Sequence, residues 1–529
     1  MPHNLKSKAR NNLYALPLIL GFLGLIFQFY KDEKQAIVLV VLFLMTGLAI
    51  NFFLNHPPYE PRERDYTYVG AFYAFAIWIG LGVLSIYEWV FLKAMKGKVG
   101  AILSTVIALG IPTLMAATEW DDHDRSNRYH SVDSAKNLLN SCAKNAILFT
   151  GGDNDTFPLW YVQEVEGFRT DVRVCNLSLL NTDWYIDQMK EDAYESAGLP
   201  ISIERDRYIQ GTNDVVYYMK RSRSKNDPPM KLDTYLSFLA NDSKQIRHPL
   251  PTQNRFKKYI NIFPSKLLVL EVDSSSLAEG NTIPNKFKSN LNSQLIWNIK
   301  KGHLEKKDII MLDMITNINR NNWERPIYFS TTLGPSNFLG LKDHMVLEGL
   351  AYRLYPTKFR NEGVIDTEVM YDNLMNNFFW RNLDDPDIFY DENYKRFSLN
   401  ARSQFYRLAS TLYGQGEKEK AKEIIAKCFE VMPDESIPYD IYSAQFIPLY
   451  LQLEEKEKAQ ELMDLMESRA IEVLNFIKEN PSGAYGDHET ISCNVLQTIM
   501  FALRRNDPKN PKVKEIENYL ITSGCYQGS

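Results

Sequence analysis

The long apolar stretches of this chain, those resembling membrane segments, lie nearly all at its N-terminal end, before Trp120. Four stretches there are long and apolar enough to cross a bilayer, which takes about 20 residues of helix. They run over residues 13–30, 36–54, 68–92 and 99–118. The second carries no charge, and the third has aromatic residues at both ends, as segments that meet a membrane interface do. We therefore predict a transmembrane region of four helices over residues 1–120, in preference to four buried core helices of a soluble protein.

The charges of the connecting loops do not determine the orientation of these helices. The N-terminus and the second loop carry five Lys and Arg residues, and the first and third loops also carry five. Positive residues favour the cytoplasmic side, so this count is a tie. The acidic run EWDDHD at 119–124 does not resolve it, because acidic residues contribute little to topology.

Composition excludes several classes of function. The formal net charge is -5, without the basic excess of nucleic-acid-binding proteins, so no nucleic-acid partner is expected. The five cysteines are widely spaced and form no CxxC pair, which favours free thiols over a zinc site or a dense disulfide framework.

The run EWDDHDRSNRYH (119–130) has carboxylates and histidines without a fixed ligand spacing. We interpret it as a solvated surface strip and predict no metal site.

The chain becomes polar and globular after the membrane region. A short apolar strand at 146–150, a GGDNDTFP turn, a helix and the buried strand VRVCNLSLL follow one another. Strand, helix and strand in this order indicate a βαβ unit and a parallel sheet. The later run KKDIIMLDMI, ERPIYFSTT and a helix near 344–354 suggests a second such unit. We predict a Rossmann-like α/β domain over 121–365, with a polar insertion at about 190–300.

From residue 366 the pattern is helical. Two segments, 408–433 and 446–470, are alike, because GEKEKAKEI in the first aligns with EEKEKAQEL in the second. Each has the apolar face, turn and second helix of a tetratricopeptide-like pair, whose usual period is about 34 residues. We predict a tetratricopeptide-like helical domain over 366–529. A plain helical bundle is the alternative, because stable repeat arrays need three or more units.

The loop HPPYEPRERDYTYVG, between the second and third apolar stretches, is dense in charges of both signs. Arg62 and Arg64 carry planar guanidinium groups that suit phosphate oxygens. Asp65 could hold these arginines in place or act on a sugar hydroxyl, and Tyr59 suits a membrane interface. We predict that these four residues bind the phosphate of a lipid-linked donor. The alternative is an interfacial loop with internal ion pairs and tyrosine anchors.

The GGDND sequence is the second candidate site. Asp153, Asn154 and Asp155 follow the carboxyl end of a predicted strand, where ligands of open α/β sheets bind. We predict an acceptor or ligand loop here, with a capped helix start as the alternative. GGDND lacks the GxGxxG spacing of a dinucleotide site, and the sequence has no GxSxG, HExxH or Walker A motif. No catalytic residue and no cofactor is therefore assigned from motifs.

Six long blocks resemble one large family of polytopic membrane proteins. They are RNNLYALPLILG, LNHPPYEPRERDYTYVGAFYAFAIWIGLGV, EWDDHDRSNRYHSVDSAKN, NAILFTGGDNDTFPLWYVQEVEGFRTDVRVCNLSLLNTDWYI, NNWERPIYFSTT and LEGLAYRLYP. Bacterial members of this family are described as a domain of unknown function, and its animal relatives are protein O-mannosyltransferases that act on plexin-type domains. The resemblance covers nearly the whole chain and is weaker in the helical tail. It implies a GT-C-type glycosyltransferase that passes a sugar, expected to be mannose, from a polyprenyl-phosphate donor to Ser or Thr of periplasmic proteins.

The resemblance also implies a location and partners. The chain would lie in the inner (cytoplasmic) membrane as a multi-pass protein, with its soluble part and the loop of Arg62 and Arg64 on the periplasmic side. Its partners would be membrane lipids, the lipid-linked sugar and a protein acceptor.

Family members carry further spans upstream of the RNNLYALP block, and GT-C enzymes usually have the catalytic carboxylate there. We therefore expect this chain to correspond to a C-terminal half that works with an N-terminal half. The alternative function is a membrane-anchored, tetratricopeptide-like interaction scaffold of the cell envelope without catalysis.

Overall fold

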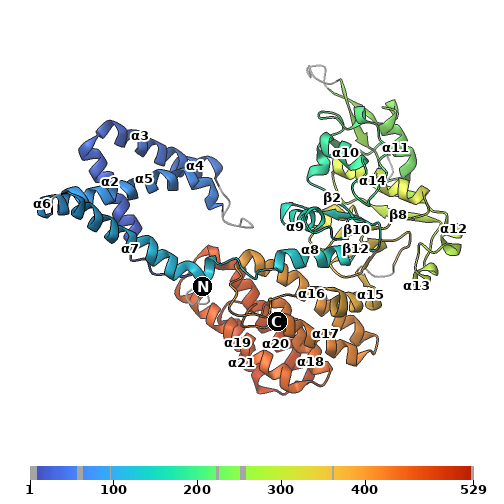
Figure 1. The fold of residues 1–529 in the computed structure, drawn as a ribbon. Helices are drawn as coiled ribbons and strands as arrows, with labels where there is room; N and C mark the ends of the chain where they lie inside the picture. The colour runs from blue at the N-terminus through green and yellow to red at the C-terminus, as the bar shows by residue number, and fades with distance from the viewer. Residues whose placement is uncertain are drawn as a thin grey trace. The chain divides into compact units, whose positions relative to one another are not determined.

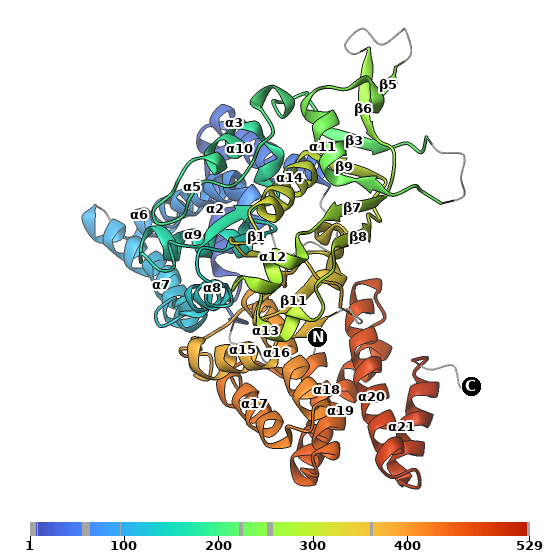
Figure 2. The same cartoon turned by 90° about the vertical axis from the view of Figure 1, so that its right-hand side faces the viewer.

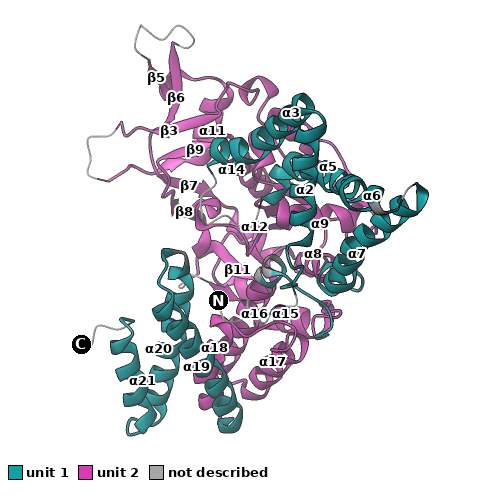
Figure 3. Cartoon of the chain, turned by 90° about the vertical axis from the view of Figure 1, so that its left-hand side faces the viewer, with its two compact units in different colours: residues 1–128, 385–395, 455–529 teal, residues 129–384, 396–454 magenta. Residues whose placement is uncertain are grey.

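The computed structural model describes residues 7, 9–55, 64–95, 97–221, 226–250, 258–359 and 363–525. The chain divides into two compact units (Figure 3). Unit 1 combines Met1–Arg128, Asp385–Lys395 and Glu455–Ser529, and unit 2 combines Tyr129–Asp384 and Arg396–Glu454. The helical N-terminal region, the mixed α/β middle region and the helical C-terminal region are all present, as predicted. The domain boundaries at 120 and 365 stay predictions.

Apolar helices form the N-terminal part of unit 1. They are α2 (Leu16–Lys31), α3 (Glu33–Leu44) continued by α4 (Ile50–Leu54), α5 (Val69–Ile86), the short α6 (Leu92–Ala94) and α7 (Lys98–His123). Among the described residues, three continuous helical stretches are long and apolar enough to cross a membrane: Glu33–Leu54, Asp65–Phe91 and Lys98–His123. The remaining predicted span, residues 13–30, corresponds to α2, an apolar helix of 16 residues that is shorter than these three. A fourth crossing at α2 therefore stays a prediction.

Helices α2 and α5 pack closely against each other, with α3 alongside (Figure 1). A Cβ atom added to Gly24 would lie 1.7 Å from the backbone oxygen of Trp78, so this approach requires glycine. Small residues allow membrane helices to meet in this way. The indole Nε1 of Trp78 donates a hydrogen bond of 2.8 Å to Gln28 Oε1, which satisfies two polar groups within an apolar region.

The core of unit 2 is a six-stranded sheet with the order β13-β11-β12-β10-β1-β2. The strands are β1 (Ile147–Thr150), β2 (Arg173–Asn176), β10 (Ile327–Ser330), β11 (Met345–Leu347), β12 (Ala351–Leu354) and β13 (Val364–Ile365). Strand β1 pairs in parallel with both β2 and β10. These three strands are fully buried, as expected of parallel strands covered on both faces. The predicted parallel βαβ unit is therefore confirmed.

The prediction of a helix near 344–354 is wrong. That segment forms β11 and β12, which pair antiparallel, and β12 also pairs antiparallel with β10. Gly349 lies between the two strands with a φ of 135°, a backbone conformation that favours glycine. Both strands are mostly buried, and a short buried apolar run does not distinguish strand from helix by its periodicity.

Four helices accompany the sheet: α8 (His130–Asn140), α9 (Asp153–Glu164), α10 (Asp183–Lys190) and α14 (Lys306–Arg320). Helix α8 packs against α9, and α14 lies beside α11 (Leu232–Ala240) of the insertion (Figure 2). The side chain of Asp313 in α14 is buried and accepts hydrogen bonds of 2.6 Å from both the backbone N–H and the hydroxyl of Ser202. This contact fixes the start of the insertion on α14.

The insertion contains short strands. They form two small sheets, one of β5 (Arg247–Pro249), β6 (Tyr259–Phe263), β3 (Val215–Tyr218) and β9 (His303–Glu305), the other of β4 (Met230–Lys231), β7 (Leu267–Glu271) and β8 (Gln294–Asn298). Two short helices, α12 (Ser274–Glu279) and α13 (Asn285–Lys288), lie between β7 and β8 in the chain. The insertion is thus an ordered α/β structure over the part of it that is described.

Helices make up most of the described C-terminal region. Its helices are α15 (Thr367–Asp372), α16 (Glu392–Gly414), α17 (Lys418–Val431), α18 (Ile441–Gln452), α19 (Lys456–Glu479), α20 (Gly486–Asn506) and α21 (Pro511–Thr522). The two aligned segments each contain a turn with one left-handed residue, Gly416 with a φ of 86° and Glu454 with a φ of 66°. The residues that follow, Glu417 and Glu455, share a ψ of 62°. The aligned sequences therefore form the same local turn, and their assignment as tetratricopeptide-like repeats stays a prediction.

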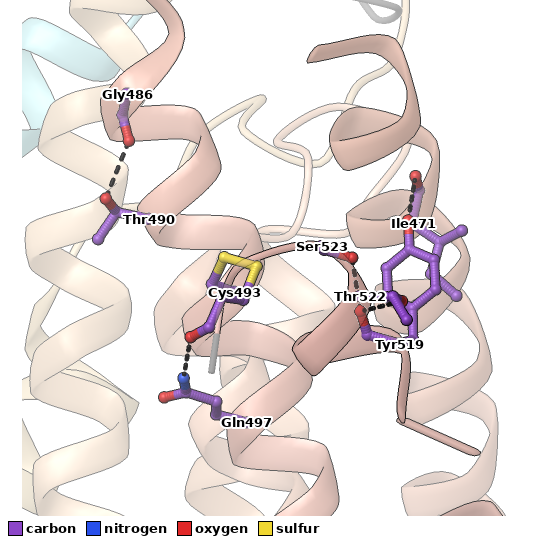
Figure 4. Close-up of a disulfide and its surroundings, with 9 residues drawn as sticks. Ile471, Gly486, Thr490, Cys493, Gln497, Tyr519, Thr522 and Ser523 are labelled. Atoms are coloured by element: carbon purple, nitrogen blue, oxygen red, sulfur yellow. Dashed lines mark hydrogen bonds between the residues drawn. A yellow bond between two sulfur atoms is a disulfide. The ribbon is translucent and has the colours of Figure 1, made fainter. Parts of the chain in front are cut away.

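The prediction of free thiols is wrong for two of the five cysteines. Cys493 in α20 and Cys525, just after α21, form a disulfide with a Cα–Cα distance of 5.5 Å (Figure 4). Cys142, Cys175 and Cys428 are free and buried, as predicted. The pair is separated by 32 residues and belongs to no short motif, so only the packing of two helices brings it together.

Candidate functional site

The loops that leave the carboxyl ends of β1 and β10 diverge. Strand β1 leads through α9 to β2 on one side, whereas β10 leads to β11 and β12 on the other side. Neighbouring parallel strands whose following loops leave in opposite directions define a topological switch point, and ligands of open α/β sheets bind at such a point. The GGDND sequence occupies the loop after β1, so the structure places it at this position.

Asp155 joins the two diverging loops. Its Oδ2 accepts hydrogen bonds from the hydroxyl of Thr332, at 2.7 Å, and from the backbone N–H of Gly151, at 3.2 Å. Its Oδ1 accepts from the backbone N–H of Gly152 at 3.1 Å. The carboxylate thus closes the first turn of α9 and holds the loop after β10 against it. The sequence left two interpretations of GGDND, an acceptor or ligand loop and a capped helix start. The contacts of Asp155 are those of a capped helix start.

A buried polar network lies beneath this turn. The hydroxyls of Thr150 and Thr156 are 2.7 Å apart, and the amide Nδ2 of Asn176 donates to Thr156 Oγ1 at 2.8 Å. All three side chains are buried. The exposed Ser178 donates to the carbonyl of Gly151 at 2.8 Å. Because buried polar groups are costly unless they are paired, this satisfied network fixes the ends of β1 and β2 relative to each other.

Asp153 and Asn154 lie at the surface of the same turn. Both are exposed, and Asp153 Oδ1 accepts from the backbone N–H of Asn154 at 3.0 Å. The elements that follow β1 and β2 also carry apolar surface, because Phe157 in α9 is 53% exposed and Trp184 at the start of α10 is 54% exposed. Exposed carboxylate and amide groups can contact a ligand by hydrogen bonding, and exposed aromatic rings can contact it by stacking.

Several residues of this edge were missed by the sequence analysis. Thr332 and Asn176 are separated from GGDND by long stretches of sequence, and only the parallel pairing of β1 with β10 and β2 brings them together. Their position in the sequence could have indicated them, because Ser330 and Asn176 are each the last residue of a buried apolar strand. Ser330 Oγ and Thr332 Oγ1 are 2.6 Å apart, so the end of β10 joins the same network.

The donor-loop prediction falls partly outside the described residues, because Tyr59 and Arg62 are not described. Arg64 and Asp65 are described, exposed, and lie at the start of the third apolar stretch. The carbonyl of Arg64 accepts hydrogen bonds from the backbone N–H of Thr67 at 3.0 Å and from its hydroxyl at 2.7 Å. These contacts fix the backbone of a 3₁₀ turn, Asp65–Tyr68, that precedes α5.

A second titratable cluster is enclosed in unit 2. Glu348, 4% exposed, accepts hydrogen bonds from the hydroxyls of Tyr328, at 2.5 Å, and Tyr355, at 2.8 Å. Burial raises the pKa of Glu348, and Arg353 lies 3.8 Å away. Because every member is enclosed and paired, this cluster contributes to the core rather than to a ligand site.

The described residues include no group of three or more His, Cys, Asp or Glu side chains that could hold a metal ion. In the EWDDHD run, the Oδ1 of Asp122 and the Nδ1 of His123 are 3.2 Å apart. A divalent ion in a protein site normally needs more protein ligands than this pair supplies.

One comparison with known proteins gives a match, and the match covers this edge of the sheet. A family model described as TMEM260-associated domain 2 matches residues 131–372. The match begins in α8 and ends with α15, so it includes the central sheet, the GGDND edge and the insertion. No curated protein and no solved structure matches the chain.

Proposed function

We propose that this chain is part of a membrane glycosyltransferase that passes mannose from a polyprenyl-phosphate donor to Ser or Thr of proteins outside the cytoplasm. The observation that carries the proposal is the match of residues 131–372 to a domain associated with TMEM260, an animal protein O-mannosyltransferase. Three helices with the length and composition of membrane spans support it, because a polyprenyl donor is reached only from a membrane.

In this proposal the donor phosphate is bound by the loop before α5. Arg64 and Asp65 lie at the end of an apolar helical stretch, where the headgroup of a lipid-linked sugar would be. Guanidinium groups bind phosphate through paired, charge-assisted hydrogen bonds. Arg62 and Tyr59 adjoin them in the sequence and complete the predicted donor site.

The acceptor is bound, in this proposal, at the carboxyl edge of the central sheet. Asp153 and Asn154 offer exposed polar groups, and Phe157 and Trp184 offer exposed rings. Asp155 takes part indirectly, by holding the turn that presents its neighbours. The catalytic carboxylate is not among the residues assigned here.

The test is sugar transfer in cells that lack the chromosomal gene and carry a plasmid copy. Mannose on envelope proteins is measured by mass spectrometry of glycopeptides, with the wild-type copy and with Arg62→Ala, Arg64→Ala and the double variant. The matched control is Lys93→Ala, which removes a cation at the other end of the same apolar stretch. We expect the double variant to lose transfer and the control to retain it. Full transfer by the double variant at normal protein levels would contradict the assignment of the donor site.

A scaffold without catalysis is the second candidate function. The observation that favours it is the helical C-terminal region with its repeated turn at Gly416 and Glu454, since stacked helix pairs commonly bind other proteins. It predicts that a partner protein co-purifies with the chain from detergent-solubilised membranes and that mannose on envelope proteins is unchanged when the gene is removed. Loss of mannose on gene removal would exclude the scaffold as the sole function.

A further inference from the structure

The apolar helices of unit 1 are joined by side-chain hydrogen bonds in two different settings. The bond from Trp78 to Gln28 is enclosed between α2 and α5, since the side chain of Trp78 is 2% exposed. Another bond runs from the hydroxyl of Tyr68 to Oδ1 of Asn51, at 3.2 Å. Here Asn51 is exposed and Tyr68 is partly exposed. The enclosed bond joins two helices, whereas the exposed bond also leaves an amide accessible from outside the helices.

Close packing of two helical segments brings Asn51 to Tyr68. A Cβ atom added to Gly70, near the start of α5, would lie 2.7 Å from Cβ of Thr46, so glycine allows this approach. Thr46 belongs to Met45–Ala49, a π-helical turn that precedes α4. Such turns are rare and occur frequently at functional sites. The bond between Tyr68 and Asn51 forms just beyond this contact.

Asn51 is a polar residue within an apolar stretch. It lies three residues before the end of Glu33–Leu54, or about 5 Å along a helix. Unpaired polar groups are costly in hydrocarbon, and polar side chains within membrane spans are commonly functional. An asparagine amide has one acceptor oxygen and two N–H donors. Tyr68 occupies the acceptor, and the described residues provide no partner for Nδ2. The donors of a fixed amide are therefore available to a ligand.

The neighbours of Asn51 indicate what kind of ligand this would be. Phe52 and Phe53 follow it in α4 and are 92% and 88% exposed. The cationic Arg64 precedes the 3₁₀ turn that ends at Tyr68. A ligand that matches all of these has an anionic group next to an apolar chain. In an isoprenoid phosphate the phosphate is attached directly to the chain, whereas a glycerol group separates the two in a phospholipid.

We propose that Asn51 and Tyr68 form a subsite for the phosphate of an isoprenoid phosphate lipid. This inference rests on the proposed function and adds to its donor site two residues from the apolar stretches. Nδ2 of Asn51 donates to a phosphate oxygen, and the isoprenoid chain contacts the exposed rings of Phe52 and Phe53. Tyr68 is a positioning residue, because its hydroxyl holds the amide in the binding orientation. A group held in advance loses less entropy when the ligand arrives.

The test is the binding of radiolabelled farnesyl phosphate to the full chain in phosphatidylcholine nanodiscs, measured by scintillation proximity. Asn51→Asp keeps the shape of the side chain and the acceptor for Tyr68, but replaces the N–H donors with a carboxylate oxygen. We expect it to weaken binding at least about tenfold, because a hydrogen bond to a charged oxygen is lost. Tyr68→Phe removes only the hydroxyl and should weaken binding about twofold to tenfold. The matched control is Gln28→Leu, which removes the enclosed amide and should leave the affinity unchanged.

A bond that serves only packing makes the opposite prediction. Asn51→Asp retains the contact with Tyr68, so wild-type affinity in this variant would overturn the proposal. If Asn51→Asp does not fold, Tyr68→Phe decides, and unchanged affinity there would overturn the proposal equally. Absence of farnesyl phosphate binding by the wild-type chain would also overturn it.

Competition identifies the source of the phosphate. Unlabelled phosphatidylglycerol and inorganic phosphate should each displace the probe at least about tenfold more weakly than unlabelled farnesyl phosphate, because neither has a phosphate attached directly to an apolar chain. Equal displacement by phosphatidylglycerol would assign the subsite to bulk phospholipid and overturn the proposal.

Lipid binding and sugar transfer are separate measurements, so the two proposals can fail separately. Mannose on envelope proteins decides the proposed function, and binding of farnesyl phosphate decides the subsite. If the wild-type chain binds the lipid through Asn51 but removal of the gene leaves mannose unchanged, the subsite stands and the proposed transfer fails. If removal of the gene abolishes mannose but Asn51→Asp binds the lipid normally, the transfer stands and the subsite fails.

Discussion

The hydrogen bond between Asp155 and Thr332 offers a direct test of whether GGDND is built for structure, for binding, or for both. Asp155→Ala removes three hydrogen bonds, two of which close the first turn of α9. Loss of such a cap costs about 1–2 kcal/mol. The bond from the Thr332 hydroxyl to a carboxylate contributes about 1.5–3 kcal/mol when enclosed, and we use the lower end because Thr332 is exposed. We therefore expect Asp155→Ala to destabilise unit 2 by about 2–4 kcal/mol.

A double-mutant cycle isolates the bond between the two loops. Thr332→Val removes only the shared hydrogen bond to Asp155 and the contact with Ser330, and should cost about 1–2 kcal/mol. The double variant should cost less than the sum of the single variants by about 1–1.5 kcal/mol, the interaction that both singles remove. Asn154→Ala, an exposed neighbour, is the control and should change stability by less than about 0.5 kcal/mol.

The assay is amide hydrogen exchange measured by mass spectrometry on peptides that cover residues 147–157, combined with urea unfolding of the detergent-solubilised protein. Exchange reports local opening, so it does not depend on a single transition for the whole chain. Asp155→Ala should speed exchange of the Gly151 and Gly152 amides, which then lack their acceptor. A carboxylate kept only for ligand binding is commonly destabilising, and its removal leaves stability unchanged or raises it. An unchanged or raised stability of Asp155→Ala would therefore refute the structural role.

Three further predictions concern other parts of the chain. Cys493→Ser should lower the free energy of unfolding of the C-terminal helices by about 3–4 kcal/mol, which is the loop entropy that a disulfide spanning 32 residues removes from the unfolded chain. In urea unfolding, this difference between the variant and the wild type should be seen without reductant and should vanish when reductant is added. Burial lowers the pKa of His344, so the folded state holds it neutral, and wild-type stability should fall as pH drops below about 6.5 by up to about 1.4 kcal/mol per unit. His344→Asn keeps a donor towards the carbonyl of Thr357 and should flatten that pH dependence in urea titrations; an equally steep dependence would assign it to another group. Gly24→Val places a branched side chain against the backbone of α5 and should lower the yield of folded protein in size-exclusion chromatography, whereas Gly80→Val, at a site with open space, should not.

The elements predicted best were those whose residues share one environment along their whole length. Strands β1 and β2 are four-residue runs buried at every position, and the turn between β1 and α9 carries the polar residues typical of a helix start. The apolar helical stretches were recognised for the same reason, since lipid demands an uninterrupted apolar run. Local sequence is sufficient where the environment does not change from one residue to the next.

The elements predicted wrongly depend on partners far away in the chain. Residues 345–354 form a buried hairpin because β12 pairs with β10, and nothing within the segment identifies that partner. The disulfide is of the same kind, because Cys493 and Cys525 meet only once α20 and α21 have packed. Periodicity and short motifs report on a segment and its immediate neighbours, and both of these features arise from pairing between segments.

The two interpretations of GGDND that the sequence left open turn out to describe different residues of one turn. Asp155 accepts three hydrogen bonds that hold the turn, whereas Asp153 and Asn154 are exposed. A rigid turn that presents exposed groups is what a binding loop needs, since groups held in advance lose less entropy when a ligand arrives. The two roles therefore support each other. Substitutions at Asp153 or Asn154 should affect acceptor binding with little change in stability, and substitution of Asp155 should reduce both together.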